Sequence, residues 1–294
     1  MGESVFSTMR NSPRTRTSGS NGRSAGSGWV NIDELAAGAA SFADIVGAVS
    51  EIRRLESEIR ELGAAHSSIL ISGESGTGKE MLAKALHSSG MQPARSLVVI
   101  NCACLNEARP GVNPARDLRE IVEQKDGGTI LFDHIGELSP EAQQTLSDTL
   151  QRTAANGVTL RSRIMATSSR DIRDMASRGL FRCELLDCIA EAEIWIAPLR
   201  ERPDDISAMI GFFFRHYSNR FAHSIKRISL HAFDRLKDHR WPGNVRELKN
   251  AIESAVLLAN DYELDVSDIP VDWSETRAGH SAEKPANASS PPMP

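Results

Sequence analysis

Apolar residues along this chain form two kinds of pattern. Between Val49 and Leu62 they recur at spacings of three and four residues, which predicts one amphipathic helix. Short continuous apolar runs follow, separated mostly by segments with helical spacing, at 69–71, 97–100, 129–132, 164–166 and 194–196. Continuous runs of this length are typical of strands that are buried on both faces. The alternation predicts an α/β fold, a three-layer αβα sandwich around a parallel five-stranded sheet.

Beyond Pro198 the apolar spacing is purely helical. Apolar residues recur every three or four positions within 206–214, 230–236 and 245–256, which predicts a small all-α domain. The turn Trp241-Pro242-Gly243-Asn244 precedes the last of these helices. We therefore expect an α/β domain over residues 31–200 and a helical domain over 201–270.

The two ends of the chain differ from the middle in composition. Residues 1–30 are rich in Ser, Gly and Thr and basic in charge, and residues 271–294 are rich in Ala, Ser and Pro. Segments of this kind bury too little apolar surface to offset the entropy of ordering them. The sequence therefore predicts a disordered basic arm at the N-terminus and a disordered tail at the C-terminus.

Composition narrows the function classes. The chain has 34 Lys+Arg against 39 Asp+Glu among 294 residues, a net charge of −5, which excludes a generally basic nucleic-acid binder. We expect no direct DNA binding. No apolar stretch is long enough to span a bilayer, and no secretory signal is visible, so a cytoplasmic protein without membrane contact is expected. The four cysteines match neither zinc-ribbon nor CxxC spacing.

The segment GESGTGKE at 73–80 carries the strongest chemical signal. It follows the apolar run 69–71 directly and opens a helical segment, which is the context that a phosphate-binding loop requires. Glycines let the backbone turn its N–H groups inward toward phosphate oxygens, and a lysine meets the β- and γ-phosphates. We assign nucleotide binding to Gly73, Glu74, Ser75, Gly76, Thr77, Gly78, Lys79 and Glu80. Glu80 stands where the general motif has Ser or Thr for magnesium.

A second phosphate-site signal is the apolar run that ends at Asp133, in GTILFDHIGEL over 128–138. A carboxylate at this strand end holds Mg²⁺ through water in such folds. The next residue in ATPases of this type is normally a glutamate that polarises the attacking water, whereas here it is His134. An imidazole is shorter and differently directed than a glutamate carboxylate, so weak or absent hydrolysis is expected.

These motifs, with several others, resemble the AAA+ central domain of bacterial sigma-54-dependent transcription activators, also called enhancer-binding proteins. The resemblance runs through Ile45-Val46-Gly47, GESGTGKE, NCA (101–103), GGTILFDHIGEL (127–138), GLFRCEL (179–185), APLRERPDDI (197–206) and WPGNVRELKNAIE (241–253). It implies a P-loop NTPase (AAA+) sandwich with a helical lid, assembly into rings, and ATP bound with Mg²⁺ between subunits. The GKE ending is a trait of this family.

The resemblance also implies roles for further residues. Val46 and Gly47 match nucleotide-binding positions, and Arg246 matches the lid arginine that senses the γ-phosphate. Arg182 matches the first of two arginines that reach into a neighbouring subunit's site. The candidate catalytic residues are therefore Asp133, His134, Arg182 and Ser169.

The chain departs from the family pattern at several positions. Cys188 stands where the second inter-subunit arginine is expected, and Ser168-Ser169 stand where the family usually has Thr-Asn. Between Asn101 and Gly127 there is no GAFTGA signature, the segment with which the family touches sigma-54. The missing residues are those that serve ATP hydrolysis and contact with sigma-54 in the family, whereas the nucleotide-binding motif is intact.

The sequence therefore predicts an ATP-binding protein of the sigma-54-interaction type in transcription regulation. It would act through protein contacts, with itself or with related AAA+ activator subunits in a ring, and with impaired hydrolysis. One alternative is an active AAA+ ATPase that remodels a target other than sigma-54. A second alternative is an interaction scaffold with a vestigial nucleotide site.

Overall fold

The predicted strands form one parallel sheet in the order β3-β4-β5-β2-β6. The computed structural model describes residues 28–35, 68–89, 95–106, 114–124, 127–155, 162–221, 225–259 and 263–275. The strands are β2 (Ile69–Gly73), β3 (Leu97–Asn101), β4 (Gly128–Asp133), β5 (Ser162–Ser168) and β6 (Ala192–Ile196). The central strands β2, β4 and β5 are almost entirely buried, which explains their continuous apolar sequences.

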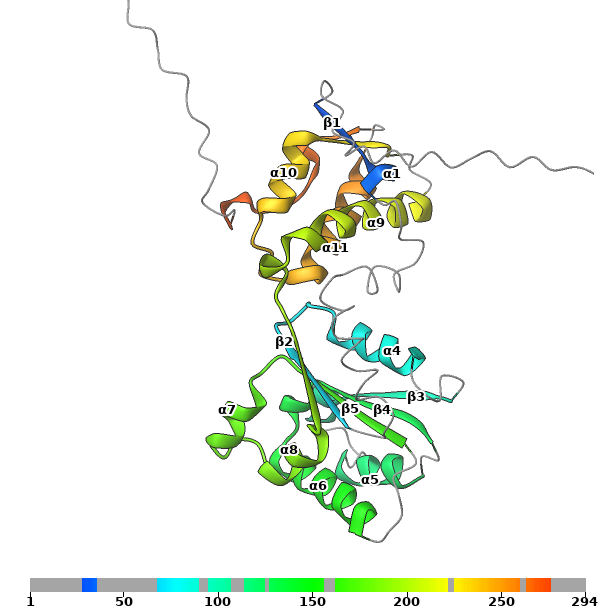
Figure 1. Cartoon of the computed structure of the whole chain (residues 1–294), viewed down its shortest axis with the longest axis vertical. Helices are drawn as coiled ribbons and strands as arrows, with labels where there is room; N and C mark the ends of the chain where they lie inside the picture. Colours follow the sequence, from blue (N-terminus) through cyan, green and yellow to red (C-terminus); the bar gives the residue numbers. More distant parts are fainter. Residues whose placement is uncertain are drawn as a thin grey trace, which may run out of the picture.

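Helices cover both faces of this sheet (Figure 1). α4 (Lys79–Ser89) packs against β2, β4 and β5 on one face. The other face is covered by α5 (Pro114–Gln124), α6 (Pro140–Ala155) and α8 (Cys183–Ile189), with α7 (Ile172–Ser177) beside α8. Leu70, Phe132 and Leu146 belong to the apolar core between sheet and helices on this face. The predicted three-layer αβα sandwich is confirmed.

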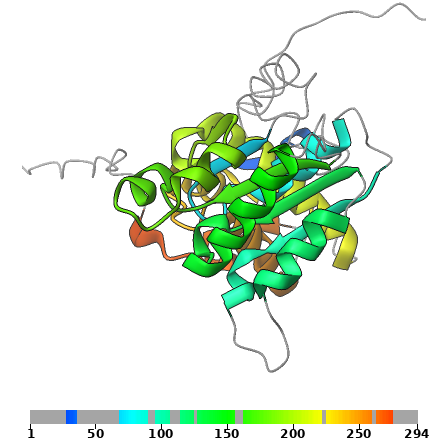
Figure 2. The same cartoon turned by 90° about the horizontal axis from the view of Figure 1, so that it is seen from below.

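A second, mostly helical unit follows β6. Its helices are α9 (Pro203–Phe221), α10 (Leu230–Asp238) and α11 (Asn244–Leu258). Figure 1 shows this unit beyond the end of the sheet that carries the loop after β2, and Figure 2 shows it behind the sheet unit when the molecule is seen from below. Trp241 is fully buried in it, and its indole N–H donates to the Leu236 carbonyl at 2.9 Å.

This second unit, which corresponds to the expected lid, contains a small sheet in addition to the predicted helices. β7 (Arg227–Ser229) pairs antiparallel with β1 (Trp29–Asn31) and parallel with β8 (Glu263–Leu264). The short helix α1 (Ile32–Leu35) packs against α9. The boundary that the sequence placed at residue 30 therefore falls inside β1, and residues 31–35 belong with the lid rather than with the α/β unit.

Several predictions concern parts of the chain outside the described residues. They are the arm up to residue 27, the tail beyond residue 275 and the helix between Val49 and Leu62. Within the described part, no helix combines the length and apolar character needed to cross a membrane.

Candidate nucleotide-binding site

The glycine-rich loop joins the end of β2 to the start of α4. Gly73, Gly76 and Gly78 have φ values of 153°, 78° and 104°, a region that side chains with a Cβ rarely adopt. Thr77 is buried, and its hydroxyl donates to the Glu74 carbonyl at 2.9 Å. The loop thus has the tight turn ahead of a helix N-terminus that the sequence predicts for phosphate binding.

Lys79, the first residue of α4, is the buried charge of this loop. Its Nζ donates to the carbonyls of Gly73 and Glu74 at 2.8 and 2.7 Å and to the Ser169 Oγ at 2.8 Å. Burial lowers the pKa of Lys79 to about 8, against the attraction of Asp133, which raises it. Ser169, predicted as a catalytic residue, therefore lies in contact with Lys79, the lysine predicted to bind phosphate.

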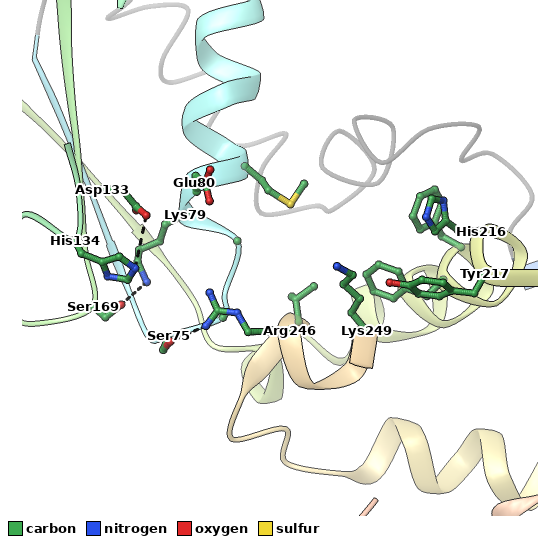
Figure 3. Close-up of a pocket in the computed structure, with 16 residues that line it drawn as sticks. Ser75, Lys79, Glu80, Asp133, His134, Ser169, His216, Tyr217, Arg246 and Lys249 are labelled. Carbon is green, nitrogen blue, oxygen red and sulfur yellow. Dashed lines mark hydrogen bonds and ion pairs between the residues drawn. The ribbon is translucent and has the colours of Figure 1, made fainter. Parts of the chain in front are cut away.

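Asp133 and His134 lie at the carboxyl end of β4, next to Lys79 (Figure 3). The Thr167 hydroxyl on β5 donates to the Asp133 Oδ1 at 2.5 Å and accepts from the His134 backbone N–H at 3.1 Å. Thr167 was not singled out by sequence. His134 has a left-handed backbone with φ of 59°, and its Nε2 lies 3.6 Å from the Asp133 Oδ2. Backbone geometry of this kind is concentrated at functional sites.

A pocket of about 660 Å³ lies between the loop and the lid, a size within the range of small-molecule sites. Its polar end is lined by loop and β-strand residues that the sequence predicted, namely Ser75, Gly76, Gly78, Lys79, Glu80, Asp133, His134 and Ser169. Glu80 faces it while pairing with Lys84 at 2.6 Å. His216 and Tyr217 of α9 lie at the opposite end (Figure 3). Phe212 and Phe213 also line the pocket, and ring contacts connect the four residues into an aromatic wall that the sequence did not single out.

The predicted lid arginine, Arg246, reaches the glycine-rich loop. Its Nη1 donates to the Ser75 Oγ at 3.2 Å, and its backbone N–H donates to the Gly76 carbonyl at 3.3 Å. A Cβ on Gly76 would lie 2.2 Å from the Gly243 carbonyl oxygen. The start of α11 thus packs directly on the loop, and Lys249, one helical turn beyond Arg246, also lines the pocket.

Glu74 faces the lid, although its sequence position suggested nucleotide binding. Arg200 donates to both of its carboxylate oxygens, at 2.8 and 2.6 Å, and Asn244 donates to Oε2 at 3.1 Å. These bonds, led by that from Arg200, lower the pKa of Glu74. Asn244 is fully buried, donates to the Ser75 carbonyl at 3.0 Å and accepts from the Leu199 N–H at 2.7 Å.

A further arginine, Arg202, completes this connection by donating to the Thr77 carbonyl at 3.0 Å. We call Glu74, Arg200, Arg202 and Asn244 the loop–lid clamp. Arg200, Arg202 and Asn244 lie in the motifs APLRERPDDI and WPGNVRELKNAIE, but the sequence predicts no role for them. Hydrogen-bond partners more than a hundred residues apart cannot be identified from spacing alone.

Two positions named from the sequence, Arg182 and Cys188, lie away from this pocket, and two others are not among the described residues. Arg182 precedes α8 and does not line the pocket; its backbone N–H donates to the Gln143 Oε1 at 3.1 Å, and its Nε lies 3.8 Å from Glu184. Cys188 is half-buried on α8, and burial raises the pKa of its thiol. Val46 and Gly47 lie outside the described residues.

Comparison with known proteins identifies the family to which the two units of this chain are similar. A model of the sigma-54 interaction domain matches residues 46–199, and a model of the AAA+ ATPase lid domain matches residues 200–286. Transcriptional regulatory protein ZraR of Klebsiella oxytoca is 34% identical over 246 residues, covering 77% of this chain and 55% of ZraR. Transcriptional regulatory protein FlbD of Caulobacter vibrioides is 36% identical over 222 residues, covering 70% of this chain and 49% of FlbD.

The chain thus spans about half the length of these two relatives. Its fold is similar to that of NtrX from Brucella abortus, solved in complex with ATP, with a TM-score of 0.64 and 23% identity over 84% of this chain and 57% of NtrX. Fold, lid and sequence agree. The chain belongs to the sigma-54 interaction domain family and joins that domain to an AAA+ ATPase lid domain.

Proposed function

We propose that this protein binds ATP with Mg²⁺ in the pocket between loop and lid, hydrolyses it weakly or not at all, and regulates transcription through contacts with AAA+ subunits. One observation carries the proposal. The groups that the sequence predicts to bind phosphate line one pocket, whereas the residue after Asp133 carries an imidazole rather than a carboxylate.

The phosphate-binding part of the proposal rests on Lys79 and the loop. The Lys79 ammonium is buried against the loop carbonyls, and Arg246 enters from the lid. Two cations that line one pocket favour a polyphosphate over a singly charged ligand. The aromatic wall offers flat apolar surface to the base of a nucleotide.

Asp133 fits the Mg²⁺ that accompanies such a nucleotide. Its carboxylate lies at the strand end facing the pocket, and the Thr167 hydroxyl fixes Oδ1. Hard carboxylate oxygens and water are the ligands that Mg²⁺ prefers. When bound, the cation would neutralise phosphate charge; Asp133 would hold it through water, and Lys79 and Arg246 would orient the phosphate chain.

Weak hydrolysis follows from the residues that would activate water and stabilise charge. His134 offers one imidazole nitrogen where a glutamate would offer a longer carboxylate. Arg182 lies outside its own subunit's pocket, and Cys188 provides no positive charge at the second arginine position. A site that binds ATP tightly and turns it over slowly suits a nucleotide-dependent regulator.

The missing sigma-54-contacting signature supports a role through other protein partners. The segment between Asn101 and Gly127 lacks the GAFTGA signature, so we propose no direct contact with sigma-54. Instead the chain joins a ring with copies of itself or with related AAA+ activator subunits and changes their activity.

Calorimetric titration of ATP and of ADP in the presence of Mg²⁺, run beside a phosphate-release assay on the same sample, tests the nucleotide part. We expect micromolar binding with little or no phosphate release, and loss of binding in Lys79→Ala. Turnover of about 1 per second or faster that Lys79→Ala abolishes would instead establish an active ATPase with another target. Absence of binding would leave a scaffold whose nucleotide site is vestigial.

A further inference from the structure

Asp133 and His134 form a pair of polar side chains at the strand end of the pocket. Both side chains line the pocket, with the imidazole Nε2 3.6 Å from the carboxylate Oδ2 (Figure 3). The His134 side chain is 33% exposed and that of Asp133 is 14% exposed. A nitrogen donor and an oxygen donor thus face the same space.

Hydrogen bonds from a neighbouring strand hold both members of this pair. One hydroxyl, that of Thr167, donates to Asp133 Oδ1 and accepts from the His134 N–H, so it holds both residues at once. The left-handed turn at His134 then directs its ring back over the strand end toward Oδ2. Because Thr167 is fully buried on β5, the support is rigid.

The spacing of the two donors matches shared coordination of one ion. Two ligands bound at about 2.0–2.1 Å lie about 3.0–3.6 Å apart for bond angles between about 90° and 120°. The observed 3.6 Å falls at the upper end of that range, within reach of a small side-chain rotation.

The chemistry of the pair selects the ion. Imidazole nitrogen is a good ligand for first-row transition metals, whereas Mg²⁺ demands oxygen ligands and keeps its water. We propose that the cation site beside the nucleotide, where Asp133 would hold Mg²⁺, also accepts a first-row transition-metal dication through Asp133 and His134 and binds it more tightly than Mg²⁺. This inference rests on the proposed nucleotide binding and concerns the same pocket.

The test uses Mn²⁺ as the probe, because its electron paramagnetic resonance reports both binding and the atoms around it. Mn²⁺ is titrated into the full chain with a non-hydrolysable ATP analogue and then displaced by Mg²⁺. We expect the protein to require about ten-fold more Mg²⁺ for displacement than His134→Asn requires. Asparagine is the matched variant, since it tolerates the left-handed backbone and offers an amide oxygen in place of the ring nitrogen.

A second measurement does not depend on the His134→Asn variant. In the wild-type protein, isotope labelling of histidine nitrogen should change the nitrogen coupling seen on bound Mn²⁺, and Asp133→Asn should remove the bound signal. Equal Mg²⁺ requirements in wild type and His134→Asn, with no nitrogen coupling, would overturn the inference while nucleotide binding stands. A wild-type protein that binds no nucleotide with either cation would overturn the proposed function itself.

Discussion

At the residue scale, Lys79 links nucleotide binding to pH. Its pKa of about 8 arises chiefly from burial, which penalises the charged ammonium. A polyphosphate favours the protonated form, so binding above pH 8 must first take up a proton. We therefore expect ATP affinity to be flat below about pH 8 and to fall above it, by about ten-fold at one pH unit beyond the pKa.

Calorimetry on either side of pH 8 measures this loss, and buffers of different ionisation enthalpy report the proton uptake directly. Lys79→Arg is the control, because a guanidinium stays charged across this range. Its ATP affinity, even if lower throughout, should not change with pH. A flat wild-type profile would show that Lys79 is not the group on which binding depends.

Two glycines of the loop separate backbone strain from packing. Gly76 and Gly78 both have positive φ, but only at Gly76 would a Cβ meet an atom, the Gly243 carbonyl oxygen at 2.2 Å. Gly78→Ala should cost about 1–2 kcal/mol of stability from strain alone. Gly76→Ala should cost about 1–3 kcal/mol more, because the lid must move. Urea unfolding of both variants compares them; equal losses would argue against tight loop–lid packing.

At the element scale, the loop–lid clamp joins β2's loop to the lid. Arg200 and Glu74 form a bidentate pair there, and Arg173 and Glu193 form a similar bidentate pair on the surface of the sheet unit. Both arginines are more than a third exposed, so solvent screens both pairs, and the Arg200 pair should contribute at most about 1 kcal/mol to stability. Arg200→Ala should nevertheless weaken ATP binding several-fold, whereas Arg173→Ala should leave it unchanged.

Calorimetric titration of ATP into the two variants measures this difference, and an equal effect of both would mean that the clamp does not act on the site.

The contribution of the Arg200–Glu74 pair to stability depends on pH with a defined sign. Because the bond from Arg200 lowers the pKa of Glu74, the stabilisation from this pair is present at neutral pH. It is lost as the pH falls below the ordinary carboxyl range.

Elements were predictable where one local signal decides them. The runs around Ile71, Leu131 and Ala166 are buried on both faces, so continuous apolar sequence marks them as central strands. β1 escaped prediction because it has three residues and pairs with β7 almost two hundred positions away. The glycine-rich loop was also predictable from a local signal, because its glycines, its lysine and the start of the helix are contiguous in sequence.

The remaining part of the site depends on tertiary contact. The sequence predicts that Asn244 belongs to a turn. Nothing in the neighbouring residues indicates that its side-chain amide donates hydrogen bonds to Glu74 and to the Ser75 carbonyl. The same holds for Thr167, one residue of a buried strand whose hydroxyl fixes Asp133. Glu74 shows the converse, because membership of the loop motif suggested phosphate contact whereas its carboxylate faces the lid.

At the scale of the whole molecule, the arginine that would complete a neighbour's site lies on the outside of this one. Arg182 is held at its backbone by Gln143, and its side chain has a loose pairing with Glu184, so it is available to a second subunit. We expect ATP with Mg²⁺ to drive association, because nucleotide bound at a shared interface stabilises the assembly that binds it. Sedimentation of the full chain, alone and mixed with an activator from its own cell, measures this.

Arg182→Ala should bind ATP like the wild type, since the residue does not line its own pocket, but should lose the ATP-dependent association. Arg178→Ala is the matched control, an exposed arginine of the same segment that pairs with Asp174. It should associate normally, because it belongs to none of the family's motifs. If all three proteins sediment as single subunits with ATP, with or without the activator, then the nucleotide acts within one chain and the ring is not its route to transcription.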